Sequence, residues 1–459
     1  MTSSTTTLDT QATSSPSFAA RETEDRQRRL LRCGFIALVA SGILLRILIA
    51  ALGGNGMRTP WGGGGDTQAY VLLAHNLVEG HGYAYAGEPT ALRAPAYPLL
   101  LAGTMKLLGN YALSGMRWMQ FGEGLATVLL CAAAARRIFD EQAAKAVLLV
   151  ALFFPTLLIM NGEILSEATA TFLCTLSLYL MIRYVQEPQW LTLTALGLTI
   201  GLAALTRFNM ALLGGVAVVA CLLANGALPK WKAVAWVTLF SLLVVSPWLI
   251  RNEVVFRGQV LFSTHDGIDA VEGVLTPQGR ALAGDSERLR AALGWVAPEE
   301  AETNSPSRHL LPTESTLDRD AWKVAGALWR QESWALVPLE LRKISYFWLS
   351  ADQLLSTEGF PLRERIFRGA GVVFYWGLLA LAIMGWVQLR TQNPTFALLF
   401  LAYAVLVTML HLPFVMNTRL RMPFLDPWIT VLAGAALAAF AEMKNERGLA
   451  QELLAGIAS

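Results

Sequence analysis

The chain has 459 residues, of which 54% are hydrophobic and only 15% are charged. One soluble core cannot bury so large an apolar fraction, so the composition excludes an ordinary water-soluble protein and predicts a membrane protein. The 36 lysines and arginines nearly balance the 34 aspartates and glutamates, and the net charge of +2 gives no argument for a nucleic-acid partner.

The chain begins with a Ser/Thr-rich segment and a basic run, and residues 1–33 are expected to be a disordered cytoplasmic tail because they lack the apolar core of a cleavable signal. A bilayer core about 30 Å thick needs roughly twenty apolar residues of helix. Stretches of this kind predict about ten transmembrane helices, at 34–52, 114–135, 142–160, 164–182, 190–206, 209–226, 232–250, 368–388, 395–413 and 422–441.

Lysine and arginine in the short loops indicate the orientation, because such loops keep their basic residues in the cytoplasm. This rule predicts a multi-pass protein of the inner (plasma) membrane with both termini in the cytoplasm. The predicted organisation is an N-terminal membrane domain at 34–250 that contains an outer loop at 53–113, an extracytoplasmic region at 251–367, C-terminal membrane helices at 368–441 and a cytoplasmic tail at 442–459.

The extracytoplasmic region is rich in acidic residues. Within it, Pro298–Thr316 is expected to be mobile because of its Pro, Ser, Glu and Thr content. The helical periodicity of Ala321–Trp334 predicts a helix that packs on the membrane domain.

The outer loop at 53–113 contains the most informative residues. Glycines at 62–65 let the chain turn sharply before Asp66, which opens a helical stretch containing Tyr70. Asp66 either caps this helix or serves as a general base at the membrane surface. Arg93 either reaches lipid headgroups or pairs with a phosphate that arrives from the membrane. The following stretch at 96–109 is too short to span comfortably, and is expected to lie at the interface with Tyr97 as an aromatic anchor.

The four cysteines and the histidines do not form a metal-binding pattern. The cysteines are widely separated in or beside apolar stretches and are expected to be buried apolar fillers: Cys33, Cys131, Cys174 and Cys221. His75, His81 and His265 lack the spacing of a zinc motif, so no metal site is expected.

Several motifs, taken in order, resemble the dolichyl-phosphate-mannose protein mannosyltransferase-like superfamily, whose bacterial relatives include the aminoarabinose transferases. After Asp66 come A-x-N-L-x-x-G-x-G-Y and P-T-A-x-R-x-P-x-Y-P. Further matching segments are Glu163–Glu167, Gly201–Arg207, Ser246–Asn252 and Arg419–Pro427. The resemblance covers roughly residues 34–440 and implies an all-α membrane protein with the C-type (GT-C) glycosyltransferase fold.

The resemblance also implies a reaction. The acid that matches Asp66 deprotonates an acceptor hydroxyl, which then displaces polyprenyl phosphate from a hexose or pentose with inversion. A polyprenyl-phosphate sugar is the co-substrate, and no metal or other cofactor is expected. Many relatives carry Asp-Glu at this position, whereas Thr67 follows Asp66 here, which leaves the identity of the donor open.

Arginines on the predicted outer side are candidates for the donor phosphate, because they oppose the usual inward bias of basic residues and could stabilise a leaving phosphate. They are Arg93, Arg207, Arg251, Arg419 and Arg421. Glu163 and Glu167, one helical turn apart, are expected to orient an arginine or bind sugar hydroxyls; a partnership with the helix N-terminal dipole is the alternative. Tyr70 and Tyr97 are further candidates for sugar or acceptor contacts.

Two other functions remain open at this point. A flippase or transporter for lipid-linked glycans would need charge near the bilayer midplane, where Arg46 is the main charged residue. A polymerase or ligase would move whole oligosaccharides from a diphosphate-linked donor, and the region at 251–367 could supply its acceptor groove. The acceptor itself, whether protein, lipid or polysaccharide, is not indicated by the sequence.

Overall fold

The computed structural model describes residues 18–52, 64–85, 87–225, 229–275, 314–331, 333–350 and 362–458. These residues are almost entirely helical, and a short antiparallel hairpin joins β1 (Ala84–Tyr85) to β2 (Glu88–Pro89). The all-α prediction is therefore confirmed. Most of the Pro298–Thr316 segment and part of the glycine run at 62–65 lie outside the described residues.

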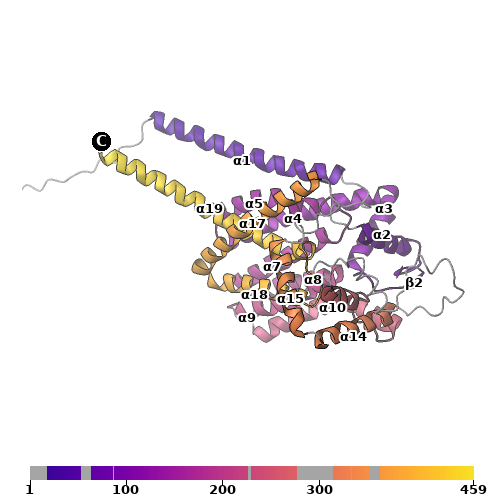
Figure 1. Ribbon diagram of the computed structural model, residues 1–459. Helices are drawn as coiled ribbons and strands as arrows, with labels where there is room; N and C mark the ends of the chain where they lie inside the picture. Colours follow the sequence, from indigo (N-terminus) through magenta and orange to yellow (C-terminus); the bar gives the residue numbers. More distant parts are fainter. Residues whose placement is uncertain are drawn as a thin grey trace, which may run out of the picture.

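The bundle is built from long helices and several shorter ones (Figure 1). They are α1 (Phe18–Leu52), α4 (Ala112–Ile138), α5 (Glu141–Phe153), α6 (Pro155–Ile159), α7 (Glu167–Gln186), α8 (Trp190–Thr206), α9 (Leu213–Leu223), α10 (Lys230–Phe256), α17 (Leu362–Gln392), α18 (Pro394–His411) and α19 (Thr418–Ala458). Among the described residues, seven helices are long and apolar enough to cross a membrane. A helix occupies each of the ten predicted positions, but α5, α6, α8 and the segment Phe208–Leu223 are each shorter than the roughly twenty residues that cross a bilayer.

Two breaks in the helices account for these shorter segments. The predicted span at 142–160 divides at Phe154, whose backbone is extended, and Pro155 then starts α6. The spans predicted at 190–206 and 209–226 are separated by Arg207, also extended, and by the 3₁₀ helix η2 (Phe208–Leu212). Because a residue in extended backbone cannot continue a helix, each break turns the chain and leaves polar groups near the break free for other partners.

Arg46 of α1 lies at the first of these breaks. Pro155 has no N–H, so the carbonyl of Ala151 has no helical partner, and the Arg46 guanidinium donates to that carbonyl at 2.8 Å. The same guanidinium donates to the carbonyl of Leu157 at 3.1 Å and to Asn161 Oδ1 at 2.7 Å. Arg46 is fully buried, and its hydrogen bonds give it a structural role within the bundle.

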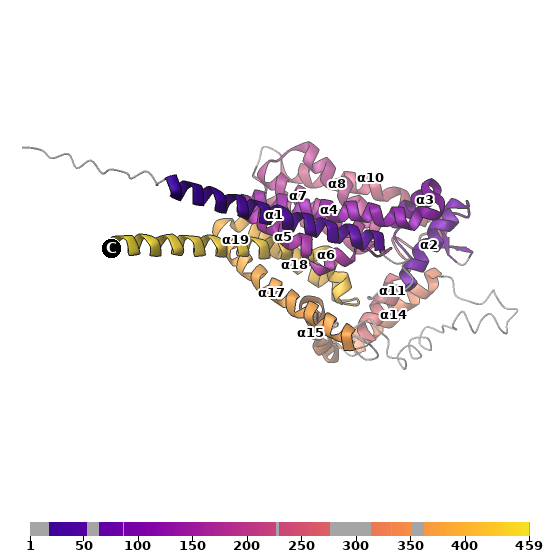
Figure 2. The same cartoon turned by 90° about the horizontal axis from the view of Figure 1, so that it is seen from above.

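Short elements gather at one end of the bundle. They are α2 (Gly64–Val78), α3 (Ala96–Leu108), α11 (Asp266–Leu275), α14 (Glu314–Gln331) and α15 (Ser333–Leu349). Figure 2 shows α2, α3, α11 and α14 at the end away from the first turns of α1 and the last turns of α19. The chain ends that the structure describes therefore lie together, opposite the hairpin and these short helices.

The helix α14 packs against α11 and against Phe414 in the turn between α18 and α19, and it ends at Gln331, before the end of the predicted segment Ala321–Trp334. Ala270, Ala321 and Ala325 form a small buried cluster with Phe414 packed against it, and the ring of Trp322 meets Phe414 edge-on at 5.9 Å. Trp334, at the far end of the predicted segment, is 88% exposed.

Three further expectations meet different outcomes. Helix α1 begins at Phe18, within the segment that was predicted to be a disordered tail up to residue 33. Cys131, Cys174 and Cys221 are buried as predicted, but Cys33 is exposed because it lies on the solvent- or lipid-facing surface of α1. The short helix α3 is confirmed, whereas Tyr97 is fully buried against Tyr70 and does not anchor an interface.

Candidate functional site

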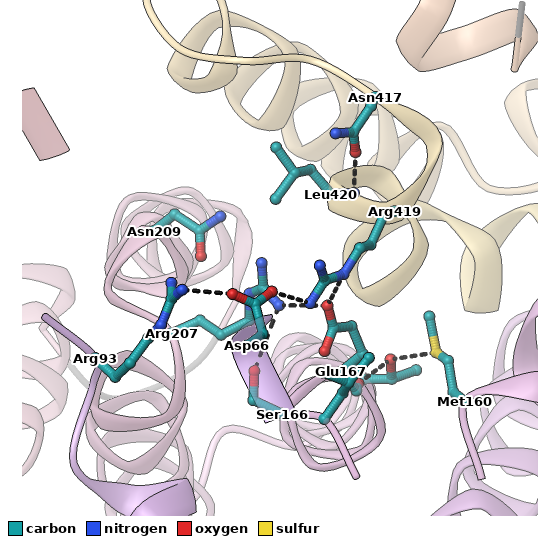
Figure 3. Close-up of polar contacts among 12 residues, drawn as sticks. Asp66, Arg93, Met160, Ser166, Glu167, Arg207, Asn209, Asn417, Arg419 and Leu420 are labelled. Atoms are coloured by element: carbon teal, nitrogen blue, oxygen red, sulfur yellow. Dashed lines mark hydrogen bonds and ion pairs between the residues drawn. The ribbon is translucent and has the colours of Figure 1, made fainter. Parts of the chain in front are cut away.

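Five charged side chains form one continuous chain of ion pairs (Figure 3). Asp66, in the first turn of α2, pairs through Oδ1 with Arg93 and through Oδ2 with Arg419 Nη2 at 2.6 Å. Arg419 also donates from Nε to Glu167 Oε1, and the same oxygen accepts from Arg207 Nη1 at 3.0 Å. Three guanidinium groups and two carboxylates (3 − 2 = +1) leave one excess positive charge in this cluster.

The cluster forms because four of its members lie at or near the ends of helices. Asp66 and Glu167 stand in the first turns of α2 and α7, where a carboxylate interacts favourably with the helix dipole. Arg207 occupies the break after α8, and Arg419 lies in the first turn of α19. These ends meet on the side of the bundle that carries α2, so residues far apart in sequence become neighbours.

Neutral side chains hold the ion pairs in place. The Tyr70 hydroxyl lies 3.0 Å from Ser166 Oγ. Arg207 Nη1 donates to the same Ser166 Oγ at 3.4 Å. The Thr67 hydroxyl donates to the carbonyl of Ile164 at 3.2 Å, which fastens the start of α2 to the turn before α7. Thr67 is buried and serves as a link between these two elements.

The electrostatic environment keeps Asp66 ionised. Burial raises the pKa of the Asp66 carboxyl, but the adjacent Arg93 and Arg419 guanidinium groups lower it by more, so the pKa lies below its usual value. Burial lowers the pKa of Arg93, but Asp66, Tyr70 and Asp269 together more than offset this effect, so the pKa of Arg93 is raised. In this arrangement Asp66 is a carboxylate neutralised by two arginines.

A cavity of about 340 Å³ adjoins the cluster. Arg93, which pairs with Asp66, and Arg207, which pairs with Glu167, both line it. Side chains of α11 contribute Asp266 and Asp269 to its wall. Burial, together with the neighbouring carboxylates Asp269 and Asp318, raises the pKa of Asp266 to about 6, so this carboxyl is still mostly ionised at neutral pH.

Two of the arginines predicted to bind phosphate lie elsewhere. Arg421 is fully buried and pairs with Asp426 at 2.9 Å, and its Nη1 donates to the carbonyl of Phe347 and to Ser350. Arg251 donates to the carbonyls of Thr90 at 2.8 Å and Tyr83 at 3.0 Å, which fastens the hairpin loop to α10. Arg421 and Arg251 thus join parts of the fold and do not line the cavity described above, and their predicted role at a phosphate stays a prediction.

The remaining candidates divide in the same way. Tyr70 lines the cavity and its ring lies 6.0 Å from the Arg93 guanidinium carbon, so its predicted place beside a ligand is retained. Tyr97 is fully buried with its hydroxyl 3.4 Å from Gln120 Oε1, and so cannot touch a sugar. Glu163 stands in the turn before α7, where its carbonyl accepts from Gln120 Nε2 at 2.8 Å, and its role in sugar binding stays a prediction.

The sequence interpretation missed polar residues on the cavity wall. Asn209 lies in the 3₁₀ turn directly after Arg207, and His411 is the last residue of α18. Both fall at the ends of predicted spans, where a polar residue beside an apolar run is a usable signal. In the part of the chain that the structure describes, no group of three or more His, Cys, Asp or Glu side chains is placed to hold a metal ion.

Comparison with known proteins confirms the resemblance seen in the sequence. Residues 92–250 match the family model described as dolichyl-phosphate-mannose-protein mannosyltransferase. No curated protein matches the chain in sequence. The match supports transfer of glycosyl groups by a membrane enzyme.

Solved structures are similar to this one at low sequence identity. The oligosaccharyltransferase of Archaeoglobus fulgidus, tethered to an acceptor peptide, is 15% identical with a TM-score of 0.50, and the similarity covers 90% of this chain and 50% of that one. ArnT from Cupriavidus metallidurans, bound to undecaprenyl phosphate, is 18% identical with a TM-score of 0.41 over 88% and 78% of the two chains. The chain thus spans about half the length of the archaeal enzyme, and the predicted GT-C-like fold is confirmed.

Proposed function

We propose that this protein transfers a sugar from a polyprenyl-monophosphate carrier to an acceptor hydroxyl with inversion, and that Asp66 is the general base. The observation that carries the proposal is the ion-pair chain Arg93–Asp66–Arg419–Glu167–Arg207 with its excess positive charge beside a cavity. The description of the matching family names dolichyl phosphate mannose, a sugar on a polyprenyl monophosphate, and this supports the same class of donor.

The arginines suit a phosphate leaving group. A sugar phosphodiester carries one negative charge and the polyprenyl phosphate released from it carries more, so fixed guanidinium groups stabilise the transition state more than the bound substrate. Arg93 and Arg207 line the cavity from two different elements and can contact one phosphate together. No metal is required for this stabilisation.

Asp66 takes the acceptor proton in the proposed reaction. As the acceptor oxygen forms its bond to the anomeric carbon, its proton passes to the Asp66 carboxylate. The bond from that carbon to the phosphate oxygen breaks, and its electron pair leaves with the polyprenyl phosphate. When the donor phosphate pairs with Arg93, that arginine neutralises Asp66 less completely, which makes the carboxylate a stronger base once the donor is bound.

An apolar groove beside the cavity supports a lipid-linked donor. The groove has a volume of about 250 Å³ and runs between α8, α9 and α10. Ala211 and Phe262 line both the groove and the arginine-bearing cavity, so the two spaces adjoin. A polyprenyl chain in the groove would bring its phosphate to the arginines.

Filling the groove is expected to weaken binding of long-chain donors. Gly214 lines the groove and has no atom within 4 Å of the position of an added Cβ, so Gly214→Phe can be accommodated while its ring occupies the groove. We expect KM for an undecaprenyl-phosphate sugar to rise about 10-fold or more, the loss of a few buried methylene groups. A short-chain donor, such as a citronellyl-phosphate sugar, should be affected far less.

The neighbouring glycine provides a matched control for this measurement. Gly215 also has open space for a Cβ but is exposed on α9 and does not line the groove. Gly215→Phe should therefore leave both KM values near those of the wild type. Equal effects of the two substitutions, or no effect of Gly214→Phe, would contradict a lipid chain in this groove.

The location of the site is proposed to be the extracytoplasmic face of the inner membrane, with both termini in the cytoplasm. Figure 2 supports this arrangement, since α2, α3 and α11 lie at one end of the bundle and the described chain ends at the other. The acceptor is a hydroxyl-bearing protein, lipid or polysaccharide.

The competing functions have less support. Arg46, the charge deep in a span that a transporter would use, is fully buried and donates to protein oxygens. The proposal is tested with purified protein in liposomes that contain radiolabelled polyprenyl-monophosphate sugars or diphosphate-linked oligosaccharides, with membrane extract as the source of acceptor. Consumption of a monophosphate donor is expected. Use of the diphosphate donor alone, or movement of intact labelled lipid across the bilayer without its cleavage, would overturn the proposal.

A further inference from the structure

The hydrogen bonds of His411 fix the arrangement of its imidazole. This residue is buried at the end of α18, between the rings of Phe347 and Phe424, each with its centroid 5.3 Å from that of the imidazole. Its Nδ1 lies 2.7 Å from the carbonyl oxygen of Val407, which can only accept a hydrogen bond. Nδ1 therefore carries the proton, and in the neutral ring Nε2 is an acceptor.

The acceptor at Nε2 in turn orients Asn209. The distance between His411 Nε2 and Asn209 Nδ2 is 3.0 Å, and the amide nitrogen must face the imidazole because only that end of the amide can donate. The carbonyl end of the amide is thereby turned away from His411. Asn209 Oδ1 is buried and has no hydrogen-bond partner.

A buried amide oxygen without a donor is unfavourable, so such a group in a cavity marks a place for a ligand. Both Asn209 and His411 line the cavity that Arg93 and Arg207 also line. In Figure 3 the Asn209 oxygen is turned to the side on which Arg207 and Asp66 lie. The unused acceptor is therefore close to the proposed position of the phosphate.

We infer that Asn209 is a specificity-determining residue that accepts a hydrogen bond from a ring hydroxyl of the donor sugar, and that His411 is the positioning residue that holds its amide in this orientation. The inference rests on the proposed function. Arg207 and Asn209 are two residues apart on either side of Phe208, so a phosphate on the arginine brings the sugar that it carries next to the amide. The hydroxyl donates its proton to Asn209 Oδ1, and no bond is broken.

The inference is tested with polyprenyl-monophosphate hexoses and the set of their monodeoxy analogues, measured as kcat/KM in liposomes. Asn209→Ala is expected to lower kcat/KM for the hydroxylated donor about 10- to 100-fold. The analogue that lacks the contacted hydroxyl should be a poor donor for the wild type and lose little more in the variant. For every other deoxy analogue, kcat/KM relative to the fully hydroxylated donor should fall by the same factor in the wild type and in the variant.

Two variants of His411 separate positioning from packing. His411→Phe keeps an aromatic ring between Phe347 and Phe424 but removes the acceptor that orients Asn209, so it should lose discrimination against the same deoxy analogue. His411→Gln restores an acceptor and should recover part of that discrimination. Asn110→Ala, at an exposed asparagine in the 3₁₀ turn η1 (Gly109–Tyr111), is the matched control and should behave as the wild type.

The possible outcomes are distinguishable. If the wild type is active and Asn209→Ala has the same kcat/KM, the inference is wrong and the proposed function stands. The same holds if Asn209→Ala discriminates among all the deoxy donors as the wild type does. A wild type that consumes none of the monophosphate donors overturns the proposed function and this inference with it.

Discussion

Asp66→Asn is expected to lower the rate of sugar transfer about 10²- to 10⁴-fold, the usual contribution of a positioned general base. The substitution keeps the size of the side chain and still offers one oxygen to Arg93 or Arg419, so the fold should survive. An amide can accept hydrogen bonds from the arginines but cannot take the proton of the acceptor hydroxyl, so the substitution removes the general base. The measurement is the initial rate with a saturating polyprenyl-monophosphate donor, alongside the binding of labelled donor.

A carboxylate elsewhere in the same loop controls for the loss of charge. Glu88 is exposed in the hairpin, and Glu88→Gln should transfer sugar at the wild-type rate. An Asp66→Asn variant that binds donor and transfers sugar as the wild type does would show that Asp66 is a helix cap and an arginine partner, the alternative that the sequence left open.

The pH dependence of transfer should follow the state of Asp66. Because Arg93 and Arg419 hold the pKa of this carboxyl below its usual value, the wild type should keep its base ionised down to pH values below about 4. In Arg93→Met one lowering influence is lost while burial still raises the pKa, so the acid limb of the normalised rate profile should move to higher pH. A limb that stays in place would mean that another group is the base.

The cluster around Asp66 could be predicted in outline because charge at the end of an apolar span is conspicuous. Arg207 and Arg419 flank predicted spans and Glu167 lies at the start of another, whereas Asp66 and Arg93 stand in the outer loop; all five meet in the structure. Their mutual contacts could not be derived from the sequence, since they depend on how several helix ends converge in space.

The sequence could not tell Arg419 from Arg421 for a geometrical reason. Residues two apart on a helix point about 200° apart, so only one of them can face the site. Arg419 faces Asp66 and Glu167, and Arg421 faces Asp426 and the end of α15. The contacts of Arg251 could not be predicted either, because its partners are backbone carbonyls of Tyr83 and Thr90 and the sequence does not show where a carbonyl will lie.

The breaks in the bundle were predicted to different degrees. The polar pair around Arg207 and Asn209 indicated the interruption after α8, and the structure has the break there. The interruption at Pro155 lies within an apolar stretch that was assigned to one span at 142–160, although a proline inside a helix removes a hydrogen bond. The partner of the freed Ala151 carbonyl is Arg46, and this pairing could not be predicted because the two residues are 105 positions apart.

Arg46→Met is expected to destabilise the folded protein by about 2–5 kcal/mol, because it leaves the carbonyls of Ala151 and Leu157 and the side chain of Asn161 buried without this donor. Methionine fills similar space, so the loss is mainly one of hydrogen bonds. The midpoint of thermal unfolding in detergent should fall by roughly 2–5 °C, because the unfolding entropy of so long a chain is large.

Arg32→Met on the exposed surface of the same helix is the matched control, and it should leave the unfolding midpoint nearly unchanged. The two variants also distinguish an enzyme from a transporter. If Arg46 only satisfies the break at Pro155, the protein that remains folded should transfer sugar at the wild-type rate per molecule. If Arg46 instead lay on a path for lipid-linked glycans, Arg46→Met would lose activity but would have the same unfolding midpoint as Arg32→Met. That result would show that the structural role inferred from the three hydrogen bonds of Arg46 is wrong.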